Sequence, residues 1–94
     1  MAVSVIHNQE EQAFYATVNG HEAELAYSRP ADDVIDLAHT FVDESLRGQG
    51  VGEELARTAL AYARDQQLKV LTSCRFVAAF VQRHRADYEA ILAH

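Results

Sequence analysis

The sequence is poor in the residues that mark several classes of protein. It has one cysteine, which cannot form an internal disulfide, and only one proline and four glycines, unlike a disordered or fibrous chain. No apolar run approaches the roughly 20 residues that a membrane-spanning helix needs. The first residues lack the basic stretch of a secretory signal peptide. These absences predict a soluble, cytoplasmic protein.

The length and composition predict one folded domain over residues 1–94. The chain is 49% hydrophobic and 23% charged, which is typical of a globular protein. Since a single domain usually takes about 100 to 200 residues, there is no room for a second. The histidines show no metal-ligand spacing with Cys74, so no metal site is expected.

Basic residues are scarce in the first half of the chain. The formal net charge is −6, which argues against nonspecific binding to nucleic acid or to an anionic membrane. Residues 1–46 carry a net charge of −8, and residues 47–94 carry +2. The acids of the first half are Glu10, Glu11, Glu22, Glu24, Asp32, Asp33, Asp36, Asp43 and Glu44. The split indicates either solvated faces or an anionic ligand held by the second half.

The first half alternates apolar and polar residues as strands do. Strands are predicted over residues 3–7, 14–18, 25–27 and 34–42. The dipeptide Asn19-Gly20 favours the positive φ angles of a tight hairpin turn. A second turn is predicted at residues 29–33, where Pro30 fixes φ and two aspartates follow.

The strand at residues 34–42 is apolar on both sides. Its alternation assigns the residues to two faces, with Val34, Ala38 and Val42 on one and Ile35, Leu37, His39 and Phe41 on the other. Such a pattern is typical of a central strand that is covered on both faces.

The second half has helical periodicity. A helix is predicted over residues 50–66, a strand parallel to residues 34–42 over residues 69–72, and two further helices that begin at caps. The predicted caps are Ser73, before a helix with Phe76, Val77, Phe80 and Val81 inside, and Asp87, before a short one with Tyr88. The fold class is therefore α+β, an antiparallel β-meander followed by a βαβα half.

Three alternating glycines lie between the last meander strand and the first helix, in Arg47-Gly48-Gln49-Gly50-Val51-Gly52. Glycine at a helix entrance lets an anion approach the unpaired amides and the positive end of the helix dipole. The alternative is that these glycines only make a tight turn and close helix packing. The loop lacks the Gly-Lys-Ser/Thr ending of a P-loop and the spacing of a dinucleotide-binding motif.

The loop resembles the R/Q-x-x-G-x-G/A acyl-CoA pyrophosphate loop of the GNAT acetyltransferases. The whole chain is similar to the small, roughly 90-residue GNAT-like enzymes, and the other matches are His7-Asn8, the hairpin at residues 14–27, His39-Thr40 and Cys74-x-Phe76-Val77 with Tyr88 beyond. The resemblance implies acetyl-CoA binding, with the amides of residues 49–52 on the pyrophosphate and the strand around Phe41 and Val42 beside the pantetheine arm. One of Arg75, Arg83 and Arg85 is a candidate for the 3′-phosphate, and solvated surface charge is the alternative for each of them. Phe41 replaces the glutamate that commonly follows His-Thr in the family.

Acetyl transfer to an amine needs a neutral nucleophile, donors to the developing oxyanion and a proton source for the CoA thiolate. Cys74 is the first candidate, because the predicted helix N-terminus and Arg75 favour a thiolate; a buried, inert thiol is the alternative. His39 is a candidate base, or a packed histidine. Tyr88 resembles the tyrosine that protonates CoA sulfur in many GNAT enzymes, but it also suits core packing.

Three functions follow from these features. The first is a GNAT-like N-acetyltransferase that passes an acetyl group from acetyl-CoA to a primary amine of a small molecule or a protein. The second is a noncatalytic module that binds acetyl-CoA, which Phe41 and the short N-terminal region favour. The third is an interaction domain without a ligand.

Overall fold

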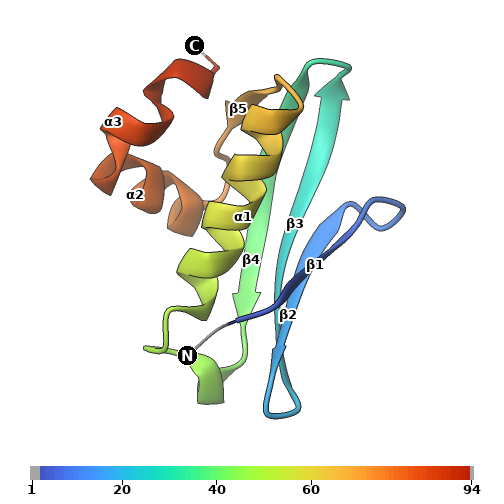
Figure 1. Cartoon of the computed structure of the whole chain (residues 1–94), viewed down its shortest axis with the longest axis vertical. Coiled ribbons are helices and arrows are strands. Elements are labelled where there is room, and N and C mark those ends of the chain that lie inside the picture. The colour runs from blue at the N-terminus through green and yellow to red at the C-terminus, as the bar shows by residue number, and fades with distance from the viewer. Residues whose placement is uncertain (1–2, 94) are drawn as a thin grey trace.

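The structure, a computed structural model, describes residues 3–93, which form a five-stranded sheet with helices on one face (Figure 1). The strands are β1 (Val5–Asn8), β2 (Ala13–Val18), β3 (His21–Ala31), β4 (Val34–Val42) and β5 (Lys69–Leu71). They lie in chain order across the sheet, β1 to β4 antiparallel and β5 parallel to β4. The α+β class and the parallel pairing of the fifth strand are confirmed.

The helices follow β4 and β5. They are η1 (Glu44–Leu46), α1 (Val51–Asp65), α2 (Arg75–Arg83), α3 (Arg85–Tyr88) and η2 (Glu89–Ile91), where η denotes a 3₁₀ helix. The predicted helix at residues 50–66 is therefore confirmed within a residue at each end. No helix in residues 3–93 is long and apolar enough to cross a membrane.

Both predicted helix caps are wrong. The N-cap of α2 is Cys74, while the Ser73 hydroxyl donates to Asp36 Oδ2 (2.8 Å) and so joins the end of β5 to β4. Asp87 lies inside α3, and its amide donates to the carbonyl of His84, the N-cap of that helix. Each side chain is one that can cap a helix, and in each case a tertiary contact or an earlier helix start prevails.

The hairpin between β2 and β3 is confirmed, with Asn19 and Gly20 at φ 52° and 80°. The second turn is shorter than predicted, because β3 continues through Pro30 to Ala31. A register shift between Ser28 and Ala31 removes Pro30, which has no N–H, from the hydrogen-bond ladder.

A β-bulge in β4 determines which side chains face the helices. Ala26 pairs with His39 and Tyr27 with Leu37, so Ala38 is an extra residue with no partner. Before the bulge, Leu37 faces α1; after it, the side facing the helices carries the even-numbered residues Thr40 and Val42. The face assignment predicted for residues 38–42 is therefore wrong.

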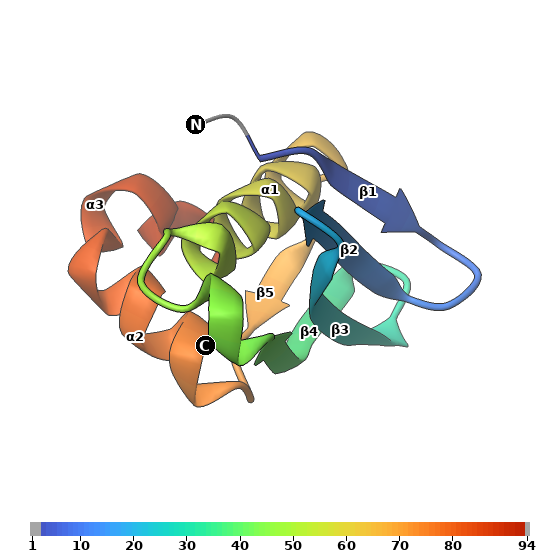
Figure 2. The same cartoon turned by 90° about the horizontal axis from the view of Figure 1, so that it is seen from below.

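The core lies between α1 and one face of the sheet. Its largest fully buried side chains include Phe14, Leu25, Ile35, Leu37, Leu55 and Leu60. Alanines at positions 56, 59 and 63 of α1 are also fully buried and let the helix lie close to the strands. No described helix lies over the other face (Figure 2), so the prediction that β4 is covered on both faces is wrong.

An aromatic cluster joins the edge strand β1 to this core. His7 stacks on Phe14 with ring centroids 4.1 Å apart, and its Nε2 lies 2.6 Å from the Tyr27 hydroxyl in a hydrogen bond. The Tyr62 ring of α1 packs edge-on against the His7 ring, with the ring centroids 4.4 Å apart. Burial lowers the pKa of His7 below its usual 6.5, since the cluster disfavours the charged imidazolium.

The folded protein is therefore expected to lose stability as the pH falls below about 6.5. The unfolded chain binds a proton at His7 more readily than the folded chain does, so stability rises with pH and is complete above the unfolded pKa. Denaturant unfolding of the wild type and of His7→Phe, which keeps a ring but cannot titrate, measures how much protonation of His7 contributes to the free energy of unfolding. The difference between the two unfolding free energies should change from pH 7.5 to pH 5; a constant difference would contradict the assignment.

Candidate functional site

The edge of β4 that faces β5 is only partly paired. β5 pairs with β4 as far as Asp36, and the Cys74 amide donates to the Leu37 carbonyl; the paired edge ends there. The Asp43 amide donates to β3, at Glu22. Because partners alternate along an antiparallel ladder, the backbone N–H and C=O groups of Thr40 and Val42 point away from β3, to the free edge.

The glycine loop leads from this edge into α1. Gly48 and Gly50 have φ of 81° and 79°, and Gly50 is an N-cap without a side chain to bond the first amides of the helix. Within the described residues, no backbone or side-chain acceptor bonds the amides of residues 50–53. The Gln49 amide donates to the Leu46 carbonyl (3.3 Å), so of the predicted amides at residues 49–52 those of residues 50–52 are free. Alternating left- and right-handed residues with free amides form an anion-binding nest.

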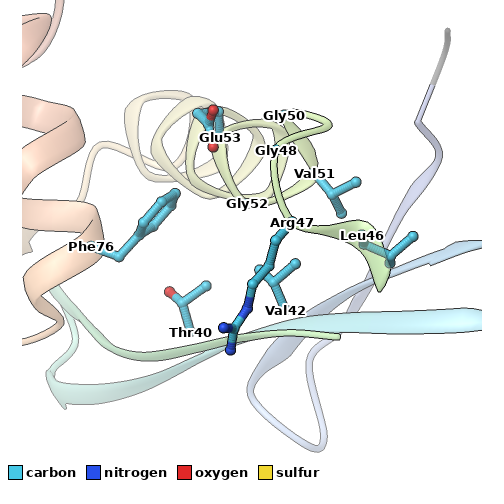
Figure 3. A pocket seen from close by; sticks show the side chains of 10 residues that line it. All are labelled: Thr40, Val42, Leu46, Arg47, Gly48, Gly50, Val51, Gly52, Glu53 and Phe76. Atoms are coloured by element: carbon cyan, nitrogen blue, oxygen red, sulfur yellow. The ribbon is translucent and has the colours of Figure 1, made fainter. Parts of the chain in front are cut away.

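A hollow of about 300 Å³ lies between the loop, β4 and α2 (Figure 3). Its lining residues are Thr40, Val42, Leu46, Arg47, Gly48, Gly50, Val51, Gly52, Glu53 and Phe76. A β-carbon on Gly52 would lie 2.8 Å from Phe76 Cζ and 3.4 Å from Val42 Cγ2. Gly52 thus serves close packing, as the alternative interpretation holds, whereas Gly48 and Gly50 serve the left-handed turn.

Cys74 lies beside this hollow, next to one of its lining residues. Its Sγ shares a hydrogen bond with Thr40 Oγ1 (3.2 Å), and Cys74 is 9% exposed. As the N-cap of α2 it has the position predicted for it, a helix N-terminus followed by the exposed Arg75. The structure therefore brings together Cys74, the free edge of β4 and the glycine loop.

Two other candidates do not reach the hollow. His39 is exposed on the opposite face of the sheet, because it alternates with Thr40. Tyr88 is buried in α3. Its ring centroid lies 6.0 Å from that of Phe80 and 5.6 Å from Cζ of the Arg64 guanidinium, which lies over the ring. Core packing accounts for Tyr88, and the hollow is not lined by it.

The two predicted cofactor-binding residues of β4 are separated by the same alternation. The Val42 side chain lines the hollow, whereas Phe41 lies 51% exposed on the opposite face. The lining residues that sequence reasoning missed are Thr40, Leu46, Glu53 and Phe76. The family matches contain two of them, Thr40 after His39 and Phe76 after Cys74, but neither was assigned to the cofactor, and Leu46 and Phe76 have the pattern of core residues.

Known proteins share the sequence pattern and the fold of this chain. Residues 13–91 match the family model described as GCN5-related N-acetyl-transferase. The chain belongs to this family. It is 30% identical over 84 residues to Protein NATD1 of Homo sapiens, covering 87% of this chain and 74% of that protein. The same protein from Mus musculus is also 30% identical over 84 residues, which cover 87% of this chain and 76% of that protein.

A solved family structure has the same fold. The solution structure of a GCN5-like protein from Staphylococcus aureus, described as a candidate N-acetyltransferase, matches with a TM-score of 0.72 at 29% identity. The match covers 96% of this chain and 87% of that one. The chain therefore has the GNAT fold that the sequence resemblance implies.

Proposed function

We propose that this protein binds acetyl-CoA and transfers the acetyl group to a primary amine. The observation that carries the proposal is the set of free amides at residues 50–53, and these residues line the hollow beside the free edge of β4. Membership of the N-acetyltransferase family supports the same activity.

The residues around the hollow fit the parts of this cofactor. The nest at residues 50–53 and the exposed Arg47 would hold the diphosphate, since each offers N–H donors to an anion. The free edge at Thr40 and Val42 would pair with the amides of the pantetheine arm, as an added strand pairs with a sheet edge. Arg75, exposed at the start of α2, is proposed for the 3′-phosphate.

Transfer would use groups that meet at Thr40. Acetyl-CoA, when bound, supplies a thioester carbonyl that an amine can attack. The backbone N–H groups of the free β4 edge are suited to donate to the carbonyl oxygen. The Cys74 thiol and the Thr40 hydroxyl share one hydrogen bond and are suited to hold or move a proton at Sγ.

The noncatalytic module is the second candidate function. It is favoured by the positions of His39 and Tyr88, which leave the hollow without a histidine or tyrosine, and by Phe41 in place of the family's glutamate. A protein with this arrangement would bind the cofactor and release it unchanged.

Calorimetry and a thiol assay separate these functions. We expect CoA to bind at least about 100-fold more tightly than pantetheine, which lacks the diphosphate, because several charge-assisted hydrogen bonds are lost. Incubation with acetyl-CoA and a panel of amines should release free CoA thiol only with an acceptor. Tight binding without release would favour the module, and no binding would contradict both.

Glu53 is expected to weaken CoA binding, because it lines the hollow, follows the free amides of residues 50–52 and carries a negative charge. Glu53→Gln should strengthen binding about two- to fivefold at low salt, since an exposed charge contributes up to about 1 kcal/mol. The matched control is Glu54→Gln on the same helical turn, where Arg57 pairs with the carboxylate at 3.0 Å. Titration of both variants with CoA measures the effect; equal affinities would place the diphosphate elsewhere.

A further inference from the structure

The face of the sheet opposite α1 is not covered by any of the described residues and carries apolar side chains. Ile6 is 69% exposed, Phe41 51% and Leu71 40%, and these large exposed hydrophobic residues of the described chain all lie on this face. Strand register places Ile6, Tyr15, Glu24 and Phe41 in one row across β1 to β4. Three strand spacings make this row about 14 Å long.

The same face is acidic. Glu22 lies two residues from Glu24 on β3, on the same side of the strand, and the Tyr15 hydroxyl donates to Glu11 Oε1 (2.7 Å). No ion pair within residues 3–93 involves any of these three glutamates. The unpaired carboxylates therefore give the face a negative charge. The hydrogen bond to Glu11, then burial, then the charges of Glu11, Glu24 and Glu22 raise the pKa of Tyr15 to about 12.

This acidic sheet face, defined by Ile6, Tyr15, Glu22, Glu24 and Phe41, adjoins the free edge of β4. Side chains alternate along one stretch of strand, with Phe41 on the acidic face and Thr40 and Val42 in the hollow. β5 pairs with β4 only as far as Asp36, so the strand edge at residues 40–42 is not bridged by β5. A molecule that lies on the acidic face can reach this edge without crossing the sheet.

We propose that the acidic sheet face docks a lysine-rich peptide segment, which is the acetyl acceptor. Lysine matches the face because its aliphatic stem covers apolar residues such as Phe41 while its ammonium group reaches Glu22 and Glu24. A row of about 14 Å suits about four extended residues and is longer than a single amine needs. The inference rests on the proposed function.

The transfer that this docking permits replaces the sulfur on the acetyl carbon with a lysine nitrogen. One lysine ammonium first loses a proton to solvent. Its nitrogen then forms a C–N bond to the acetyl carbon, the C–S bond of the thioester breaks, and CoA leaves as the thiol with one proton from the amine. The remaining lysines keep their charge on the acidic face.

The first test measures peptide binding without CoA. A fluorescent peptide of alternating lysine and glycine is titrated at low salt against the wild type and against Glu22→Gln/Glu24→Gln. Loss of two unpaired charges is expected to weaken binding about five- to tenfold, and raising the salt should reduce the difference. The matched control, Asp32→Asn/Asp33→Asn, removes two charges at the remote β3–β4 turn and should bind as the wild type does.

The second test locates the peptide. When the peptide is added, the backbone amide resonances of Tyr15, Glu24 and Phe41 in ¹⁵N spectra should shift, and those of α3 should stay unchanged. Equal weakening in both double variants, shifts confined to the helices, or binding of a free polyamine with no binding of the peptide would overturn the inference. Peptide binding at this face together with CoA binding but no acetylation would overturn its role as acceptor. CoA titration of the same variants reports on the hollow alone, so failure of the proposed function is seen separately.

Discussion

Gly50→Glu is expected to weaken CoA binding by at least about 100-fold while the protein stays folded. The new carboxylate would stand at the N-cap of α1, beside the amides that we propose hold the diphosphate, and would both repel the phosphates and occupy their donors. Losing two charge-assisted hydrogen bonds costs about 3 kcal/mol or more, which corresponds to this factor. Calorimetric titration with CoA and circular dichroism of the variant measure binding and fold.

Gly20→Glu is the matched control. Gly20 has φ of 80°, close to the 79° of Gly50, and a β-carbon at either position would meet no atom within 4 Å. Both variants therefore gain the same charge and the same left-handed strain of about 1 to 2 kcal/mol, but only one gains them at the hollow. Comparable losses of stability with unchanged CoA affinity for Gly20→Glu are expected. Wild-type affinity in a folded Gly50→Glu protein would contradict the assignment of the loop.

Local patterns were sufficient to predict most of the elements. The Asn19-Gly20 dipeptide favours the positive φ that a tight hairpin turn requires at both positions, and so predicts its hairpin. The four-residue spacing of Leu55, Ala59 and Ala63 predicts α1. The parallel β5 follows because a helix of this length joins two strands that run the same way. Each of these features depends on residues close together in the sequence.

The faces of β4 could not be predicted, because the bulge at Ala38 depends on how β3 pairs with β4. Alternation alone places His39 and Leu37 on one side, whereas the structure places them on opposite sides. This single extra residue moves Thr40 into the hollow and Phe41 out of it. His39 is a candidate base because it is a histidine on this strand just upstream of the loop, and that place in the sequence does not determine which face it occupies.

The candidate site was predicted where one motif forms it and missed where distant segments meet. The glycine loop is continuous, and glycine at its positions has a local cause in φ at Gly48 and Gly50. Phe76 enters the hollow only because α2 packs beside α1, and the hydrogen bond between Thr40 and Cys74 joins residues 34 apart in the chain. These contacts come from the tertiary packing.

Cys74→Ala is expected to lower the rate of acetyl transfer by about 100-fold and to change CoA affinity by less than about twofold. The thiol lies beside the hollow and not among its lining residues, so binding should not depend on it. A positioned proton donor or acceptor contributes about 100-fold or more to a rate. Transfer is measured as free CoA thiol released with an amine acceptor, at saturating acetyl-CoA.

Thr40→Val separates a chemical role of Cys74 from packing. Valine keeps the shape of Thr40 and removes the hydroxyl that shares the hydrogen bond with Sγ. If the thiol moves a proton in the reaction, Thr40→Val should shift the pH profile of the rate. Cys74→Ser, whose hydroxyl can take the place of the thiol in that hydrogen bond, should be more active than Cys74→Ala. Full turnover in Cys74→Ala would remove the thiol from the mechanism. Parallel losses of rate, CoA affinity and melting temperature would assign Cys74 to the packing between β4 and α2.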